Sequence, residues 1–244
     1  MGLFCISLQA HYTARMLKAI VFDFDGVIVD SEPAHYRAFL QIAQPLGLTF
    51  SYEQYLKDYV GFDDRDAFRH IFTQLGRPAP DDAQLARLIE DKAQAFEDIV
   101  DQGMDTIPGV LDLIAQAKAE GFPIAIASGA TRRDIDHILK GLKLSGGFDP
   151  IITADLVEYS KPDPTSYALA VKGLAARLPA LNIQPGDCLA IEDTAAGIAS
   201  ARGAGLMALG LTTTGSADKL GQAQRVIPNL QGVTLEKLRE WFND

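Results

Sequence analysis

The chain has 244 residues, with 22 lysines and arginines against 32 aspartates and glutamates, and its formal charge of −10 argues against a nucleic-acid groove, which needs clustered cations. Its 48% apolar content suffices for a sizeable core. Its two cysteines are too few for a disulfide framework, and no apolar run reaches the roughly 20 residues that span a bilayer. We therefore expect a cytoplasmic globular protein with no nucleic-acid or membrane partner.

Residues 1–16 form a leader for which the sequence suggests no role. The first expected element is a buried strand within LKAIVFDFDG, from Leu17 to Gly26, because a short apolar run ends there in carboxylates and glycine. The apolar spacing then changes to the 3.6-residue period of helices. Three helices are expected, around residues 36–43, 68–75 and 85–100, with no strand between residues 32 and 104.

Beyond Pro108 the sequence alternates between short apolar runs and helical patterns. Strands are expected at 123–128, 149–153, 188–192, 207–211 and 225–227, and helices at 108–120, 131–142, 164–178, 194–203 and 234–242. Such alternation is typical of a mainly parallel sheet with helices on both faces. The prediction is an α/β core made of residues 17–31 and 105–244, interrupted by an all-helical insert over residues 32–104.

Polar residues follow several of the predicted strands, at the ends where open α/β sheets bind ligands. Asp23 and Asp25 are two residues apart, so both carboxylates can face one site, where a metal ion would relieve their repulsion. A hydroxyl with free amides can hold a phosphate, a lysine supplies a point charge, and an acidic pair offers oxygen ligands to a hard cation. Three further groups of these kinds occur at strand ends: Ser128-Gly129, Lys161, and Glu192-Asp193.

Each group also has a plainer interpretation. An isolated Asp-x-Asp is commonly a solvated turn, and Ser128 and Glu192-Asp193 can cap the helices that follow them. Lys161 can be an ordinary loop lysine, since most lysines lie in water. The functional interpretation is favoured because all four groups fall at the carboxyl ends of predicted strands.

In chain order, the segments DFDGVIVDSEP, ASGATR, SKPDP and IEDTAAGI resemble the four motifs of the haloacid dehalogenase superfamily. The resemblance covers about residues 17–244 and is to the helical-cap branch, which includes β-phosphoglucomutase-like and phosphoglycolate phosphatase-like proteins. It implies a Rossmann-like core, a mobile helical cap over residues 32–104, a Mg²⁺ cofactor and a small phosphorylated substrate.

The resemblance also implies roles for the residues at the strand ends. Asp23 would be the nucleophile that becomes an aspartyl-phosphate, and Asp25 the general acid and base. Mg²⁺ would be held by Asp23, the backbone carbonyl of Asp25, and Asp193. Glu192 would be a further ligand or would contact one of these ligands. The remaining phosphoryl oxygens would be bound by four loop residues: Ser128, Gly129, Ala130 and Lys161.

Cap residues are the expected substrate contacts. Glu32 and His35 lie where the chain enters the cap, so the resemblance makes them candidates to close over the substrate, and core packing is the alternative for His35. Segment 60–65 resembles the specificity loop, in which β-phosphoglucomutases carry an arginine three residues after a glycine. Here Asp64 holds that position, which argues against mutase activity and leaves the displaced Arg65 as a candidate contact.

The predicted function is that of a Mg²⁺-dependent, monomeric phosphatase that hydrolyses a small phosphorylated metabolite, with a sugar phosphate as the favoured substrate. A β-phosphoglucomutase-type isomerase is the alternative enzyme, and a non-catalytic metabolite-binding protein is the alternative outside enzymes. The retained set of acids, serine and lysine argues against the latter. Phosphonatases of this superfamily use a cap lysine to form a Schiff base. The cap here has Lys57 and Lys92, and neither has a distinctive sequence context.

Overall fold

The computed structural model describes residues 16–59 and 64–243, and its centre is a six-stranded sheet. The strand order is β3-β2-β1-β4-β5-β6, and all neighbouring strands are parallel. This is the strand order of the Rossmann fold, so the predicted parallel α/β core is confirmed. The strands are Ala19–Phe22 (β1), Ile124–Ala127 (β2), Ile151–Ile152 (β3), Cys188–Glu192 (β4), Met207–Leu211 (β5) and Arg225–Ile227 (β6).

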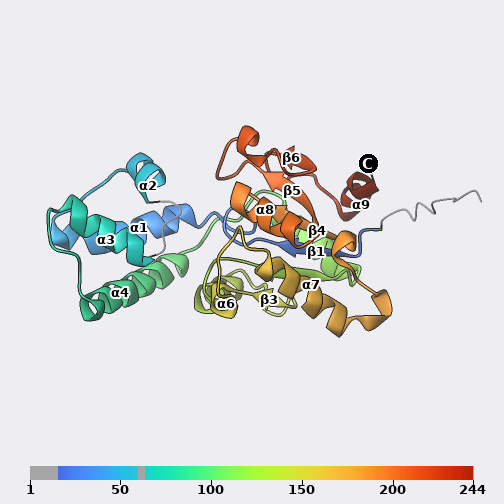
Figure 1. The fold of residues 1–244 in the computed structure, drawn as a ribbon, viewed down its shortest axis with the longest axis horizontal. Coiled ribbons are helices and arrows are strands. Elements are labelled where there is room, and N and C mark those ends of the chain that lie inside the picture. The colour runs from blue at the N-terminus through green and yellow to red at the C-terminus, as the bar shows by residue number, and fades with distance from the viewer. Residues whose placement is uncertain (1–15, 60–63, 244) are drawn as a thin grey trace, which may run out of the picture.

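Helices cover both faces of the sheet (Figure 1). Alternate β1 side chains point to opposite faces, as the pleat requires: Ile20 and Phe22 join one apolar cluster, and Ala19 and Val21 join the other. The first face is covered by α5 (Val110–Ala119), α6 (Arg132–Gly141) and α9 (Leu235–Asn243). The second face is covered by α7 (Thr165–Arg177) and α8 (Ala195–Gly203).

The third strand is shorter than expected. The predicted strand covered residues 149–153, whereas β3 contains only Ile151 and Ile152. Pro150 precedes these residues and has no amide hydrogen to donate to a neighbouring strand, although its carbonyl accepts a hydrogen bond from the Ile126 amide at 3.0 Å.

Within the described residues, four α-helices form a cap at one end of the core, at the left of Figure 1. They pack around an apolar cluster of their own that includes Phe39, Phe68 and Leu85. The cap helices are α1 (Glu32–Ala43), α2 (Tyr52–Asp58), α3 (Asp64–Gln74) and α4 (Asp82–Val100). The helical insert is therefore confirmed as a cap, whereas its limits at residues 32 and 104 stay a prediction.

Helix α2 is absent from the sequence prediction. Ser51 and Gln54 form a capping box at its start: the Gln54 amide donates to Ser51 Oγ at 3.2 Å, and the Ser51 amide donates to Gln54 Oε1 at 2.8 Å. A serine followed three residues later by glutamine is a known signal of a helix start, so this helix was detectable from the sequence.

Two linkers join the cap to the core side by side. The amide of Asp30, on the outgoing linker, donates to the carbonyl of Asp105, on the returning linker, at 3.0 Å. A second connection runs between helices, because Arg133 on α6 forms ion pairs with Glu97 at 2.6 Å and Glu90 at 3.1 Å, both on α4. The cap thus contacts the core both at the linkers and along α4.

No helix within residues 16–59 and 64–243 is long and apolar enough to cross a membrane. Most of the predicted leader, residues 1–15, and part of the predicted specificity loop, residues 60–63, lie outside the described residues.

Candidate functional site

The candidate site lies where β1 and β4 end side by side. Phe22 is in register with Ile191, and the Asp23 amide continues the pairing by donating to the Ile191 carbonyl at 2.9 Å. The residues that follow these two strands are therefore neighbours, although they are far apart in the sequence. In the observed strand order this edge is the point where the order reverses, which is where open α/β sheets bind ligands.

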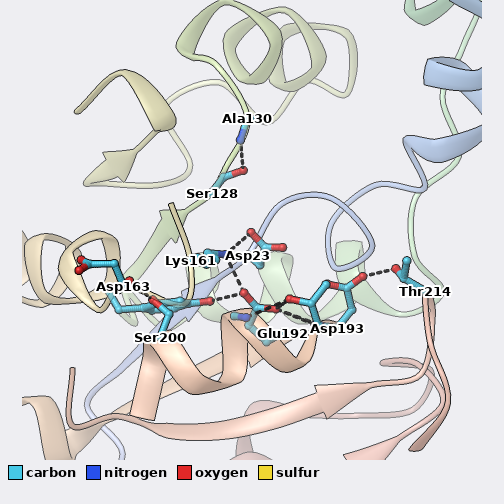
Figure 2. A network of polar contacts seen from close by, with 12 residues as sticks. Asp23, Ser128, Ala130, Lys161, Asp163, Glu192, Asp193, Ser200 and Thr214 are labelled. Atoms are coloured by element: carbon cyan, nitrogen blue, oxygen red, sulfur yellow. Dashed lines mark hydrogen bonds and ion pairs between the residues drawn. The ribbon is translucent and has the colours of Figure 1, made fainter. Parts of the chain in front are cut away.

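A buried ion pair network joins three of the predicted residues (Figure 2). Lys161 Nζ lies 2.7 Å from Asp23 Oδ1 and 2.6 Å from Glu192 Oε1. Burial alone would lower the pKa of Lys161, but the two carboxylates outweigh burial and raise that pKa above its usual range. Lys161 is therefore a fixed cation next to Asp23, and its interpretation as a solvated loop lysine is wrong.

Burial dominates the ionisation of Asp23. It raises the pKa of Asp23 well above its usual range, Lys161 lowers it, and the nearby carboxylates of Glu192 and Asp193 raise it further. A second cation at this site would favour the ionised form in the same way as Lys161 does.

Glu192 is fully buried, and both of its carboxylate oxygens have several partners. Oε1 accepts from Lys161 and from the Tyr167 hydroxyl at 3.0 Å. Oε2 accepts from the amide of the next residue at 3.0 Å, and from the amide and hydroxyl of Thr194 at 3.1 and 3.0 Å. Gly197 leaves the space for this carboxylate, because a Cβ at that position would overlap it. Glu192 thus anchors Lys161. Its partners Tyr167 and Thr194, and the role of Gly197 beside it, were not predicted from the sequence.

Three carboxylates are close enough to hold one cation. Asp23, Glu192 and Asp193 each offer an oxygen, and these atoms lie within 4.8 Å of one another. The Oδ1 atom of Asp193 is buried and has no hydrogen-bond partner within residues 16–59 and 64–243. Burial and the neighbouring Glu192 raise the pKa of Asp193 to about 7. A buried, unpartnered oxygen beside a second carboxylate fits a hard cation such as Mg²⁺.

Asp25 is not one of the three carboxylates that could share a cation. Its Oδ1 accepts a hydrogen bond of 2.5 Å from the hydroxyl of Ser31, at the entrance to the cap. Burial raises the pKa of Asp25, and this hydrogen bond lowers it. A carboxyl whose pKa is raised holds a proton more readily, as a general acid requires.

The loop after β2 brings Ser128 and Ala130 to the same edge (Figure 2). Ser128 is buried, and its Oγ accepts from the Ala130 amide at 3.0 Å. The cap of helix α6 is Thr131, whose side chain accepts from the amide of Asp134, so Ser128 does not cap that helix. Gly129 is exposed and has open space at its Cβ position, so its backbone is accessible to a ligand.

The cap contributes a buried cation, Lys92, whose sequence context is not distinctive. Lys92 is only 5% exposed, and its ammonium lies 2.8 Å from Asp64 Oδ1 and 3.0 Å from His35 Nδ1. The His35 ring stacks on Phe96 at 4.3 Å between centroids. The alternative that His35 has a packing role in the cap therefore agrees with its contacts, and burial together with Lys92 lowers its pKa well below 6.5.

The two other cap candidates lie in different surroundings. Glu32 Oε2 accepts from the Tyr55 hydroxyl at 2.7 Å, and burial raises the pKa of Glu32. Arg65 is exposed and lines a groove on the flank of the cap with Arg69 and Asp82. The structure thus brings Asp64 rather than Arg65 to the pair formed by His35 and the buried Lys92.

A parallel α/β core with a helical cap and a buried cluster of carboxylates and lysine at the switch point fits a hydrolase of the phosphatase class. The family comparison identifies the lineage: the chain belongs to the haloacid dehalogenase-like hydrolases, whose family model matches residues 20–211. The resemblance inferred from the four motifs is therefore confirmed.

The chain resembles several proteins of this family. It is 36% identical to protein CbbY of Rhodobacter capsulatus, with 92% of this chain and 98% of that protein covered. It is 26% identical to a phosphorylated carbohydrates phosphatase of Thermotoga maritima, with coverage of 78% and 82%. The crystal structure of a β-phosphoglucomutase from Clostridium difficile matches with a TM-score of 0.76 and 26% identity, over 93% of this chain and 98% of that one.

Proposed function

We propose that the chain is a Mg²⁺-dependent phosphatase that hydrolyses a small sugar phosphate through an aspartyl-phosphate on Asp23. The observation that carries this proposal is the Asp23 carboxylate held 2.7 Å from the largely enclosed Lys161 ammonium, beside the buried Asp193 and at the ligand-binding edge of the sheet. Lys161 draws an anionic phosphoryl group toward an anionic nucleophile that would otherwise repel it.

In the first step an Asp23 oxygen attacks phosphorus as the bond from phosphorus to the substrate alcohol oxygen breaks. Asp25 donates its proton to that oxygen, so the alcohol leaves in its neutral form. The raised pKa of Asp25 supports this role, since the carboxyl retains the proton that it must donate.

In the second step water attacks the same phosphorus, and the bond from phosphorus to the Asp23 oxygen breaks. Asp25, now ionised, accepts a proton from the water, and inorganic phosphate is released. Ser128 with the amides of Gly129 and Ala130 would hold the oxygens of the phosphoryl group through both steps.

Asp23, Asp193 and the Asp25 carbonyl would hold the Mg²⁺, with Glu192 beside them as the anchor of Lys161. Bound Mg²⁺ would neutralise charge between the phosphoryl group and Asp23. Glu32, His35 and Arg65 stay proposed cap contacts to the substrate. The cap would select the sugar and exclude bulk water.

The relatives favour a phosphorylated carbohydrate as the substrate. One is named as a phosphatase of phosphorylated carbohydrates, and another, of known structure, as a β-phosphoglucomutase. Because of the resemblance to a β-phosphoglucomutase, mutase activity is the alternative. A monomeric state and a cytoplasmic location are part of the proposal.

A panel of phosphorylated metabolites, assayed with and without Mg²⁺, tests this function. We expect Mg²⁺-dependent release of phosphate from at least one sugar phosphate, and its loss in Asp23→Asn. The control is Asp112→Asn, at an exposed acid on α5, which should keep wild-type activity. Retained turnover in Asp23→Asn would falsify the nucleophile assignment. Conversion of a hexose 1-phosphate to the 6-phosphate with little free phosphate would establish a mutase, and calorimetric binding without turnover a binding protein.

A further inference from the structure

The loop that follows β5 reaches the candidate metal site from a third segment of the chain. Its Thr214 hydroxyl donates to Asp193 Oδ2, as Figure 2 shows. The preceding residue, Thr213, donates through its hydroxyl to the Gly26 carbonyl at 2.6 Å. Two adjacent threonines therefore contact the segments that carry Asp23 and Asp193.

The two side-chain oxygens of Asp193 differ in their surroundings. Oδ2 has the Thr214 hydroxyl as a partner, whereas Oδ1 is buried and unpartnered within the described part of the chain. Asp193 as a whole is only 3% exposed, so bulk water does not replace the missing partner. A carboxylate held at one oxygen and free at the other is arranged to offer the free oxygen to a ligand.

Gly26 makes this approach possible. Its φ of +73° is in the left-handed region, and a Cβ at this position would overlap both Asp193 Oδ2 and Thr214 Oγ1. The glycine that ends the DFDG segment therefore provides the space in which the Asp193 carboxylate and the Thr214 hydroxyl meet. Three separate segments of the chain converge on this contact.

We infer that Thr214 is a positioning residue for the metal site, and that its hydroxyl orients the Asp193 carboxylate so that Oδ1 faces the bound cation. The inference rests on the proposed Mg²⁺ site. A hydrogen-bond partner behind a metal ligand fixes the orientation of that ligand, and its removal typically weakens metal binding by about 10- to 100-fold. Thr214 is exposed, so its replacement leaves the core of the protein intact.

Calorimetric titration of the full chain with MgCl₂, in the absence of substrate, tests the inference. Thr214→Val keeps the shape of the side chain and removes the hydroxyl, and we expect its dissociation constant for Mg²⁺ to rise about 10- to 100-fold. Thr214→Ser restores the hydroxyl and should bind within about threefold of the wild type. Thr212→Val is the matched control, because it makes the same chemical change two residues earlier in the loop.

Thermal unfolding without Mg²⁺ separates this role from a structural one. The inference requires that Thr214→Val weaken Mg²⁺ binding while the thermal unfolding midpoint of the metal-free chain stays close to that of the wild type. Wild-type Mg²⁺ affinity in Thr214→Val would overturn the inference and leave the proposed function standing. An absence of Mg²⁺ binding by the wild-type chain would overturn the metal site and the inference together.

Discussion

Replacement of Lys161 by methionine is the most direct test of the buried ion pair network. Methionine retains most of the aliphatic length of lysine and removes the charge, so Asp23 and Glu192 lose the cation that they share. The side chains are well enclosed, with exposures of 13% for Lys161, 10% for Asp23 and 0% for Glu192. Loss of one partner from a buried pair typically costs about 3–5 kcal/mol, because the remaining charge is left uncompensated.

We expect a loss near the lower end of this range, about 3 kcal/mol at pH 8, since Glu192 keeps its other hydrogen bonds. The loss should be smaller at pH 5. Burial raises the pKa of Asp23 in the folded chain, and without Lys161 that pKa is higher still. The folded variant then binds a proton more tightly than the unfolded chain does, so its stability rises as pH falls through the folded-state pKa.

Urea unfolding at pH 8 and pH 5, without Mg²⁺, measures both quantities. A loss of 3 kcal/mol corresponds to a thermal midpoint roughly 6–12 °C lower for a protein of this size. Lys172→Met, at an exposed lysine of α7, is the control and should change stability by no more than about 0.5 kcal/mol. A Lys161→Met chain within 1 kcal/mol of wild type at pH 8, or equally destabilised at both pH values, would refute the reasoning.

Two other perturbations probe the surroundings of the site. Gly197→Ala places a Cβ where the Glu192 carboxylate lies, so we expect the free energy of unfolding to fall by about 1–3 kcal/mol and activity to fall with it. Gly141→Ala, at a glycine with open space, is the control and should be nearly neutral. Equal effects of the two substitutions would contradict this account of the packing. Burial and Lys92 lower the pKa of His35, so folding excludes its proton and stability should fall below pH 6.5 by up to about 1.4 kcal/mol per pH unit. His35→Gln should make the pH 7 to 5.5 stability profile flatter than that of the wild type, and parallel profiles would argue against the shift.

The central residues of the site can be predicted from the sequence because open α/β sheets bind ligands at the carboxyl ends of their strands. Asp23 and Lys161 come after predicted strands and Glu192 ends one, and in a parallel sheet the carboxyl ends of the strands share an edge. Periodicity alone does not reveal which strands are neighbours. The contact between Asp23 and Glu192 depends on β1 pairing with β4, which is a property of the strand order.

The missed residues had weaker signals or none. Thr214 follows β5 and obeys the strand-end rule, and Lys92 lies on the apolar stripe of α4 between Leu88 and Phe96, which predicts burial. Tyr167 is different, since it reads as an ordinary core residue of α7. Its hydroxyl reaches Glu192 because of how α7 crosses the sheet, and such a crossing is set by tertiary packing.

The two linkers between core and cap leave and return at one point, joined by the hydrogen bond between Asp30 and Asp105. An insertion whose ends are held together imposes little strain on the domain that receives it. Changes within the cap, away from its contacts with α6 and the core, therefore need not alter the pairing of β1 with β2 and β4. On the proposed function, substrate choice would change with the cap while the phosphoryl-transfer site in the core stays the same.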